Sequence, residues 1–327
     1  MSYTSQIIGF GGYVPERILS NADLEKMVDT NDEWITQRTG IKERRIAAED
    51  QFASDLAIEA VKDLIAQHAV SVDDVDQIIV TTFTPDHFSP TVSALVQSHF
   101  GMQNAGTYDL AAGCTGFAYA MSVADALVVS GANKKVLVVA AEKVSQAIDY
   151  TDRSSCILFG DGAAACIVER CSKEEEQSAV LARYFHTDGD LAQYVTCTNQ
   201  SQVVNGVTQE RVRIFDQNGQ QVYKYVMKQI PQGIKTLLFE ASMDLDDIDW
   251  FIPHSANMRM IQTICEKLPF PEKTTLTSLE YHGNTSSASI PLSLWLAQKE
   301  GRLQKGDTAI LYGFGGGLTH GGVIVRF

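Results

Sequence analysis

The sequence contains an internal repeat, and this repeat restricts the fold more than any other feature of the chain. Three segments of the first half recur in the same order in the second half. The pairs are SVDDVDQIIV with DLDDIDWFIP, GCTGFA with GNTSSA, and FGDG with FGGG, which start at residues 71 and 244, 113 and 283, and 159 and 314. A single pair could arise by chance, but three pairs in a constant order indicate two structurally related units.

Helical and strand patterns surround the first of these pairs in both halves. Residues 54–69 and 222–241 carry helical periodicity, and an acidic turn then leads each of them into a short apolar strand. Strands that alternate with helices predict mixed or mostly parallel sheets covered by helices. The acidic SKEEEQ run at 172–177 is typical of a solvated connection. We therefore expect an α/β protein with two units, residues 1–172 and residues 173–327.

The composition excludes several classes of function. A formal net charge of −14 argues against nucleic acid as a partner, because phosphate binding requires clustered Lys and Arg. No stretch approaches the roughly 18 uninterrupted apolar residues of a membrane helix. The first residues, MSYTSQIIGFGG, lack the features of a secretory signal. We expect a cytoplasmic protein that binds neither nucleic acid nor membrane.

The cysteines point to one reactive position. They are irregularly spaced and form no CxxC or other metal-ligand pattern, so we expect no metal site and a reducing compartment. Five of the six are expected to be small buried apolar residues. Cys114 differs, because it lies between glycines where an apolar run passes into an apolar helix. A helix N-terminus stabilises a thiolate and lowers the thiol pKa, which makes Cys114 the candidate nucleophile.

The repeat brings two further groups toward Cys114. Asn284 in GNTSSA takes the place of Cys114 in GCTGFA, so pseudo-symmetric packing predicts that the two helix starts meet. His254 follows the repeated strand of the second half, at the carboxyl end where α/β sheets place function. His282 is an alternative base, but the repeat register favours Asn284. The glycine-rich YGFGGG at 312–317 either turns tightly or exposes N–H groups to a substrate oxygen.

Together these segments resemble the 3-oxoacyl-acyl-carrier-protein synthase III family, which has the thiolase fold. The resemblance is carried by GCTGFA, by PHSANMRMI around His254, by HGNTSSAS around Asn284 and by FGGGLTHGG near the end. DTNDEWITQRTGIKERR at 29–45 and DRSSCILFGDGAA at 152–164 also match. The resemblance implies a thiolase-like, five-layered αβαβα fold built from two pseudo-symmetric halves, usually as a homodimer. It implies neither a cofactor nor a metal.

The implied activity is a decarboxylative Claisen condensation that initiates fatty acid biosynthesis. Cys114 would take the acyl group from an acyl-CoA, and malonyl-acyl carrier protein would then lose CO₂ and attack the acyl-cysteine. The N–H groups of Cys114 and Gly316 would form the oxyanion hole. His254 and Asn284 would donate hydrogen bonds to the malonyl thioester carbonyl, and removal of one such donor should raise the barrier by on the order of 3 kcal/mol.

The resemblance also implies binding contacts. Trp34 and Arg153 match the pair that holds the CoA adenine. Arg38 matches a CoA phosphate contact, and Asn257 matches a residue that supports the pantetheine. Phe88 lies near the segment that lines the acyl pocket across the dimer interface. An acidic carrier protein requires a basic patch on this acidic enzyme. The candidates for carrier binding are Ser255, Ala256, Asn257, Met258, Arg259, Lys224 and Lys267.

Other functions share some of these features. A thiolase requires a second cysteine in the terminal glycine loop, which GFGGG lacks, and elongating synthases have a second histidine where this chain has Asn284. Condensing enzymes or acyltransferases of polyketide or signalling-molecule synthesis share the Cys, His and Asn set and are the main alternative. Papain-like peptidases also use this set, and a silent carrier-binding homologue would keep the fold alone. Ser255 stands where many family members have Gln. Residues 182–213 align poorly, and we expect them to reshape one rim of the site. The choice of primer stays open, because acyl groups that differ by a few methylenes are separated by only about 1–3 kcal/mol per methylene in a pocket.

Overall fold

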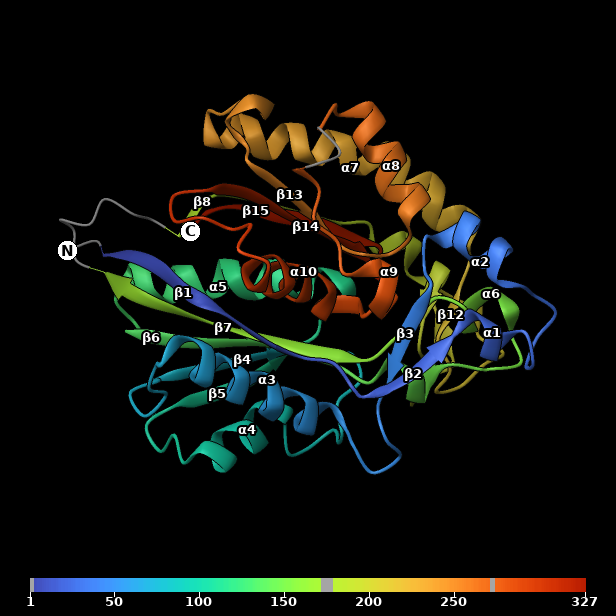
Figure 1. Cartoon of the computed structure of the whole chain (residues 1–327), viewed down its shortest axis with the longest axis horizontal. Helices are drawn as coiled ribbons and strands as arrows, with labels where there is room; N and C mark the ends of the chain where they lie inside the picture. Colours follow the sequence, from blue (N-terminus) through green and yellow to red (C-terminus); the bar gives the residue numbers. More distant parts are fainter. Residues whose placement is uncertain (1–2, 172–178, 271–273) are drawn as a thin grey trace.

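The computed structural model describes residues 3–171, 179–270 and 274–327, and the chain folds into five layers (Figure 1). Two β-sheets form two of the layers, helices separate them, and further helices cover their outer faces. Both sheets contain parallel and antiparallel pairs, as the sequence predicts. The αβαβα arrangement expected from the resemblance is confirmed.

The first sheet comes from the first half of the chain and has the strand order β1-β7-β6-β4-β5. Its strands are β1 (Thr4–Tyr13), β4 (Gln77–Thr81), β5 (Gly106–Leu110), β6 (Lys135–Glu142) and β7 (Gly162–Cys171). β4 runs parallel to β5 and β6, whereas β7 is antiparallel to β6 and β1. Buried Val, Ile and Ala side chains occupy both faces of β4 and β6, as expected of a sheet covered on both sides.

The second sheet repeats this topology. Its order is β13-β14-β15-β8, and the pairs are parallel, antiparallel and antiparallel, as they are along β4-β6-β7-β1. Its strands are β8 (Val180–Thr187), β13 (Trp250–Pro253), β14 (Thr308–Gly315) and β15 (Thr319–Arg326). A parallel bridge between Phe251 and Thr275 takes the position of the β4–β5 pairing. The weak sequence repeat is therefore a repeat of sheet topology.

The central helices are those that the GCTGFA and GNTSSA segments open. α5 (Gly116–Ser130) follows the 3₁₀ turn η1 (Gly113–Thr115), and α10 (Ser289–Lys299) follows the 3₁₀ turn η6 (Ser286–Ala288). Both helices lie between the sheets (Figure 1). The outer helices are α3 (Ala53–His68) and α4 (Val92–Phe100) on the first sheet, and α7 (Gly219–Ala241) and α8 (Met258–Lys267) on the second side.

The remaining elements are short, and most of them gather beyond one end of the sheets, at the right of Figure 1. The helices are α1 (Asn21–Leu24), α2 (Asp32–Thr39), α6 (Arg153–Cys156) and α9 (Leu279–His282). The strands are β2 (Arg17–Ser20), β3 (Glu43–Ile46), β9 (Val195–Thr196), β10 (Val203–Val204), β11 (Val207–Thr208) and β12 (Asp216–Gln217). The 3₁₀ turns are η2 (Val144–Ala147), η3 (Gly189–Tyr194) and η4 (Leu245–Asp247).

One central helix has the composition of a membrane span. Within the described residues, the stretch Gly113–Ser130 alone is long and apolar enough to cross a membrane by length and composition. The stretch is interrupted by Thr115, Ser122 and Asp125, so it is not an uninterrupted apolar run. In the fold it lies between the two sheets, and Phe117 and Met121 are fully buried there. The two sheets on either side therefore cover the apolar surface of this helix.

The predicted domain boundary falls where the structure gives no description. Residues 172–178, which contain the boundary and the acidic connection, lie outside the described residues. The first sheet ends at Cys171 before them, and the second sheet begins at Val180 after them. The division into residues 1–172 and residues 173–327 stays a prediction.

The cysteines largely follow the expectation from the sequence. Cys156, Cys166 and Cys171 are buried, and Cys265 is partly buried. Cys197 is exposed, so the expectation of a buried apolar role was wrong for this residue. It lies in the loop after β9, where the chain leaves the sheets.

A buried carboxylate connects α5 to both halves. Asp125 is 2 % exposed, and it accepts hydrogen bonds from the Ser5 hydroxyl of β1 and, at 2.7 Å, from the Arg183 guanidinium of β8. Because β1 and β8 belong to different sheets, this carboxylate joins the two halves through the helix between them. Partners on both sides also offset the cost of burying its charge.

We expect Asp125→Ala to lower the free energy of unfolding by about 2–4 kcal/mol, because Ser5 and Arg183 lose their acceptor. Denaturant titration followed by circular dichroism measures this loss. The control is Glu300→Ala, which removes an exposed ion pair with Arg302 at 3.6 Å. That change should cost less than about 1 kcal/mol, and equal losses in the two variants would contradict the role of Asp125.

Candidate active site

One cavity brings together the cysteine, the histidine and the asparagine that the sequence singles out. Cys114, His254 and Asn284 all line it, and its volume is about 390 Å³. These residues come from η1, from the end of β13 and from the turn before η6. The expectation that pseudo-symmetric packing brings Cys114 and Asn284 into one site is therefore met by the geometry.

Glycines allow the nucleophile to sit against the last strands of the second sheet. Gly113 has a φ of +50°, a left-handed value that glycine adopts without strain. A Cβ on Gly315 would lie 2.9 Å from the Cys114 Cβ and 3.1 Å from its sulfur. A Cβ on Gly313 would lie 2.6 Å from the Thr115 Cα. The segments GCTGFA and YGFGGG therefore pack directly against each other, and larger residues would separate them.

Gly316, the second predicted oxyanion-hole residue, lies beside this contact. Its backbone nitrogen is 3.7 Å from the position that a Cβ would take on Gly113. It also lines the same cavity as Cys114. Cys114 and Gly316 thus line one cavity, and the role of their N–H groups toward an oxyanion stays a prediction.

Burial controls the protonation of the nucleophile. It raises the pKa of the Cys114 thiol to about 12, and the charge of Glu142 acts in the same direction. The Ser286 hydroxyl, 3.5 Å from the sulfur, acts the other way. The expectation of a lowered thiol pKa was therefore wrong, because desolvation of the thiolate outweighs the groups that stabilise it.

His254 is a buried and neutral ring. It is 2 % exposed, and its backbone N–H donates to the Tyr312 carbonyl of β14 at 2.8 Å. Burial lowers the pKa of the imidazole to about 3, so the ring carries no charge near pH 7. Nδ1 lies 2.7 Å from the Ser289 hydroxyl, and the ring packs edge-on against Phe314. A neutral imidazole can donate one hydrogen bond from a ring nitrogen.

Asn284 is held so that its amide nitrogen is the group available to a ligand. Its backbone N–H donates to the Leu158 carbonyl at 2.8 Å, and its carbonyl accepts from the Gly160 N–H at 3.1 Å. The side-chain Oδ1 accepts from the Ser286 N–H at 2.9 Å. Because the oxygen is engaged, the NH₂ group is left to donate. His282, the alternative base, does not line this cavity.

Ser286 is a site residue that the sequence argument missed. Its hydroxyl contacts the Cys114 sulfur, and its N–H orients the Asn284 side chain. Its φ is +53°, a left-handed conformation that costs a residue other than glycine about 1–3 kcal/mol. Spacing within GNTSSA does not separate Ser286 from its neighbour Ser287, so only the contacts identify it.

The residues predicted to bind CoA lie together. Trp34, Arg38 and Asn257 line the cavity. The guanidinium carbons of Arg153 and Arg38 lie 5.0 Å and 5.5 Å from the centroid of the Trp34 ring. Arg153 also donates to the Asp29 carbonyl at 2.9 Å. Because Arg153 contacts Trp34 directly, an adenine can enter between them only after the guanidinium moves. CoA binding by these residues stays a prediction.

The cations predicted to bind the carrier protein are on the surface. Arg259, Lys224 and Lys267 are exposed, and Arg259 also lines the active-site cavity. The ammonium of Lys267 donates to the Met227 carbonyl at 2.7 Å, which attaches α8 to α7. Exposed cations beside the cavity are what docking of an acidic partner requires.

The residues just before α8, which were predicted to bind the carrier protein, do not all lie at the surface. Ala256, Asn257 and Met258 are partly exposed, and the Asn257 side chain caps α8 by accepting from the Arg259 N–H at 2.9 Å. Ser255 is fully buried, and its hydroxyl accepts from the N–H of Ser278 at 3.2 Å. The prediction that Ser255 binds a carrier protein was therefore wrong, because its side chain faces the interior.

Phe88 does not reach the site within this chain. It is 72 % exposed, and it lines a different cavity, of about 870 Å³, together with Phe83 and Arg213. Its predicted role in the acyl pocket involves a second protomer, so this arrangement leaves the role untested.

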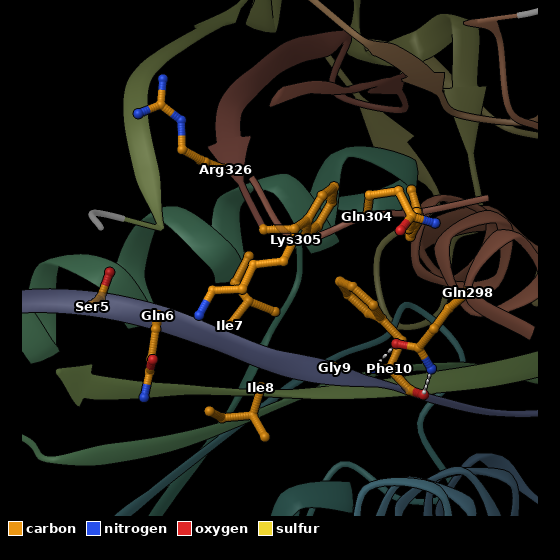
Figure 2. A pocket seen from close by; sticks show the side chains of 12 residues that line it. Ser5, Gln6, Ile7, Ile8, Gly9, Phe10, Gln298, Gln304, Lys305 and Arg326 are labelled. Atoms are coloured by element: carbon orange, nitrogen blue, oxygen red, sulfur yellow. Dashed lines mark hydrogen bonds between the residues drawn. The ribbon is translucent and has the colours of Figure 1, made fainter. Parts of the chain in front are cut away.

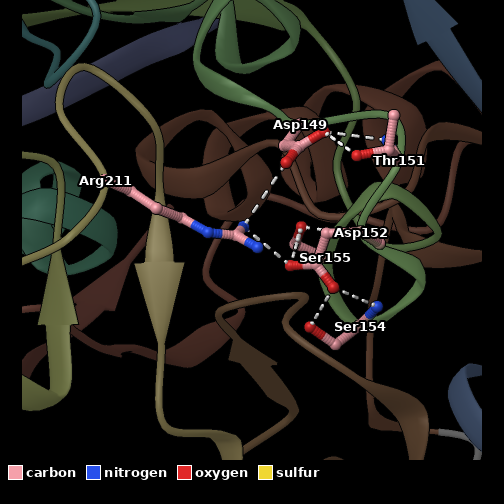
Figure 3. A network of polar contacts seen from close by, with 6 residues as sticks. All are labelled: Asp149, Thr151, Asp152, Ser154, Ser155 and Arg211. Atoms are coloured by element: carbon pink, nitrogen blue, oxygen red, sulfur yellow. Dashed lines mark hydrogen bonds and ion pairs between the residues drawn. The ribbon is translucent and has the colours of Figure 1, made fainter.

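The poorly aligned segment builds one wall of the active-site cavity. Val195 and Phe215 line it, and the Phe215 ring packs against Phe159 at a centroid distance of 4.7 Å. Arg211 anchors this wall, since its Nη1 lies 3.0 Å from Asp152 and 3.8 Å from Asp149 (Figure 3). The expectation that residues 182–213 shape one rim is confirmed for Val195, whereas Phe215 lies just beyond that range and was missed.

A separate cavity along β1 has different chemistry. It has a volume of about 300 Å³ and is lined by side chains that include Phe10, Gln298 and Lys305 (Figure 2). Gln298 binds the Phe10 backbone through both its oxygen and its nitrogen. None of the predicted site residues lines it, and its lining contains no cysteine, histidine or carboxylate side chain. Among the described residues, no group of three or more His, Cys, Asp or Glu could hold a metal ion.

Comparison with known proteins identifies the family. Residues 108–189 match the family described as 3-Oxoacyl-[acyl-carrier-protein (ACP)] synthase III, and residues 238–327 match its C-terminal part. A beta-ketoacyl-[acyl-carrier-protein] synthase III 2 from Bacillus anthracis is 52% identical over 100% of this chain and 99% of that protein. The chain belongs to the synthase III family. The Bacillus subtilis synthase III 2 is 47% identical, over 99% of this chain and 98% of that protein.

Solved structures of synthase III proteins have the same fold. The enzyme from Thermus thermophilus is 40% identical with a TM-score of 0.94, over 98% of both chains. The priming β-ketosynthase from the R1128 polyketide biosynthetic pathway is 30% identical with a TM-score of 0.92, over 100% of this chain and 97% of that chain. Both similarities extend across the two halves, so these two solved structures share the whole pseudo-symmetric arrangement described above.

The close packing of the glycine loop predicts a sensitive position in this synthase III chain. We expect Gly315→Ala to slow acylation of Cys114 at least about tenfold, because the added methyl displaces the nucleophile. Transfer of a radiolabelled short acyl group from its CoA ester measures the rate. The control is Gly219→Ala, a cavity-lining position where an added Cβ meets nothing within 4 Å. It should stay within about twofold of the parent, and equal rates in the two variants would contradict the packing argument.

Proposed function

We propose that the chain catalyses the condensation of a primer acyl-CoA with malonyl-acyl carrier protein, which initiates fatty acid biosynthesis. The products are a 3-oxoacyl-acyl carrier protein, CO₂ and CoA. One observation carries this proposal: a neutral His254 and the amide of Asn284 line the same cavity as Cys114. The relatives named synthase III match the whole chain and support the same reaction.

The first half-reaction is acyl transfer to the cysteine. The Cys114 sulfur forms a bond to the thioester carbon, the carbon–sulfur bond to CoA breaks, and CoA leaves as a thiol that takes up a proton. The N–H groups of Cys114 and Gly316 would hold the negative oxygen of the tetrahedral intermediate. The raised pKa of the thiol means that little thiolate exists before substrate binds.

The second half-reaction is decarboxylation followed by carbon–carbon bond formation. The bond between the malonyl α-carbon and its carboxylate breaks, CO₂ leaves, and the electron pair forms an enolate of the carrier thioester. His254 and Asn284 would each donate a hydrogen bond to the enolate oxygen. The enolate carbon then attacks the acyl-cysteine and expels the Cys114 thiolate. Loss of CO₂ generates the carbanion, so this step needs no general base.

The proposal includes binding partners. CoA would lie along Trp34, Arg38, Arg153 and Asn257, and the carrier protein would contact the exposed cations beside the cavity. A homodimer would bury the exposed Phe88, 72 % of which is accessible in the single chain. We propose the cytoplasm as the compartment, where acyl-CoA and carrier protein meet. The polyketide priming alternative has weaker support, because that relative is 30% identical whereas synthase III relatives reach 52%.

Acylation of Cys114 is the direct test of the first half-reaction. Incubation with acetyl-CoA or a short branched acyl-CoA should add the mass of one acyl group, read by intact mass spectrometry. Cys114→Ala should abolish this addition, whereas Cys197→Ala, which removes the exposed cysteine, should leave it unchanged. A peptidase or a silent homologue would show no adduct, and that result would refute the proposal.

The basic patch predicts a separation of the two half-reactions. Arg259→Glu should weaken use of malonyl-acyl carrier protein about tenfold, because it repels the acidic carrier, while acylation of Cys114 from acyl-CoA stays within about twofold. The control is Lys305→Glu, which makes the same charge change at the remote cavity. Steady-state kinetics for each substrate supplies both values. Equal losses in the two half-reactions would rule out a carrier-specific role for Arg259.

A further inference from the structure

The ring of His254 has a partner that neither the sequence argument nor the family resemblance assigned. Its Nδ1 lies 2.7 Å from the hydroxyl of Ser289, the first residue of α10. Ser289 is fully buried, and so is the backbone around it. The hydroxyl does not line the cavity, so it acts on the reaction only through the histidine.

The other contact of this hydroxyl determines the direction of the hydrogen bond. The backbone N–H of Ser255 donates to Ser289 Oγ at 3.2 Å. A hydroxyl has one hydrogen and two lone pairs, so the Ser255 bond uses a lone pair and leaves the hydrogen. Among the described residues, the hydrogen bonds of Ser289 Oγ are those with Ser255 and His254. The hydrogen is therefore directed at Nδ1, which accepts it.

A ring nitrogen that accepts cannot carry the proton of a neutral imidazole. Nδ1 is then the unprotonated nitrogen, and Nε2 carries the hydrogen. The contact with the Ser289 hydroxyl therefore selects this tautomer.

Buried serines keep this arrangement in place. The Ser278 hydroxyl donates to the Ser289 carbonyl at 3.2 Å, and the Ser278 N–H donates to the Ser255 hydroxyl at 3.2 Å. Ser255 follows His254 directly in the chain, so the histidine backbone and the Ser289 hydroxyl are held within one network. This network explains why Ser255 faces the interior and not the surface.

We propose that Ser289 is a positioning residue that holds His254 in the Nε2–H tautomer and so makes the ring a hydrogen-bond donor to the malonyl thioester. The inference rests on the donor role of His254 in the proposed function. Without the hydroxyl, the ring can place its hydrogen on Nδ1. Nε2 would then present a lone pair to the enolate oxygen, which repels it and removes one donor.

The same helix provides a matched control. Ser293 lies one turn after Ser289 on α10, is 2 % exposed, and donates its hydroxyl to the Ser289 carbonyl at 2.7 Å. It makes no contact with His254. Ser289→Ala and Ser293→Ala each delete one buried hydroxyl from one helix, so their effects on folding should be similar, and only the first removes the contact with the ring.

The decisive measurement separates the half-reactions. In Ser289→Ala, the condensation rate of the pre-acylated enzyme with malonyl-acyl carrier protein should fall about 10- to 100-fold, by analogy with the loss of hydrogen-bond partners that orient metal-bound histidines. Acylation of Cys114 and the KM for the carrier substrate should stay within about twofold. Ser293→Ala should match the parent in all three values. Equal condensation rates in the two serine variants would overturn the role of Ser289.

Nuclear magnetic resonance of enzyme labelled with ¹⁵N at histidine tests the tautomer itself. His254 should show a protonated Nε2 and an unprotonated Nδ1 in the parent and in Ser293→Ala, and a mixture of tautomers in Ser289→Ala. A protonated Nδ1 in the parent would overturn the inference, even where Ser289→Ala does not fold. His254→Ala distinguishes failure of the proposed function from failure of this inference. Full condensation activity in His254→Ala would refute the role of His254 as a donor. Low activity in His254→Ala together with a parent-like condensation rate in Ser289→Ala would refute only the role of Ser289.

Discussion

The active site depends on a contact between two turns, one from each half of the molecule. η1 carries Cys114 and η6 begins with Ser286, and the sulfur and the hydroxyl of these residues lie 3.5 Å apart. Beside this contact, Gly313 and Gly315 let β14 approach η1 more closely than any side chain would allow. The pseudo-symmetric sheets place the two helix starts at the same end of the central layer.

Burial gives this site its chemical character. His254 is neutral because the ring is removed from water, and the Cys114 thiol keeps its proton for the same reason. Both effects suit a reaction in which charge appears only transiently on a substrate oxygen. Hydrogen-bond donors fixed in a site of low polarity stabilise such a charge more strongly than water does. A buried serine that directs the hydrogen of His254 fits the same requirement, because a neutral donor is useful only when its hydrogen points the right way.

The sequence predicts the fold and the three reactive residues better than it predicts their surroundings. Two related α/β halves, the central helices and the pairing of Cys114 with Asn284 follow from a repeat, because equivalent segments occupy equivalent places in two packed halves. The thiol pKa and the interior position of Ser255 were predicted wrongly. Both depend on how much water reaches a group, and this depends on neighbours far away in the sequence. Phe215 was missed for the same reason, since the wall of the cavity comes from a segment without a recognisable pattern.

The amino-acid sequence by itself determined that two α/β units repeat one topology and that a cysteine and an asparagine open equivalent helices. Local periodicity and turn-forming glycines are properties of neighbouring residues, so they can be read along the chain. Only the tertiary structure decided that Ser286 touches Cys114, that Ser289 faces Nδ1 of His254, and that burial raises the pKa of the Cys114 thiol. These are consequences of distance and solvent exclusion between segments that packing alone brings together.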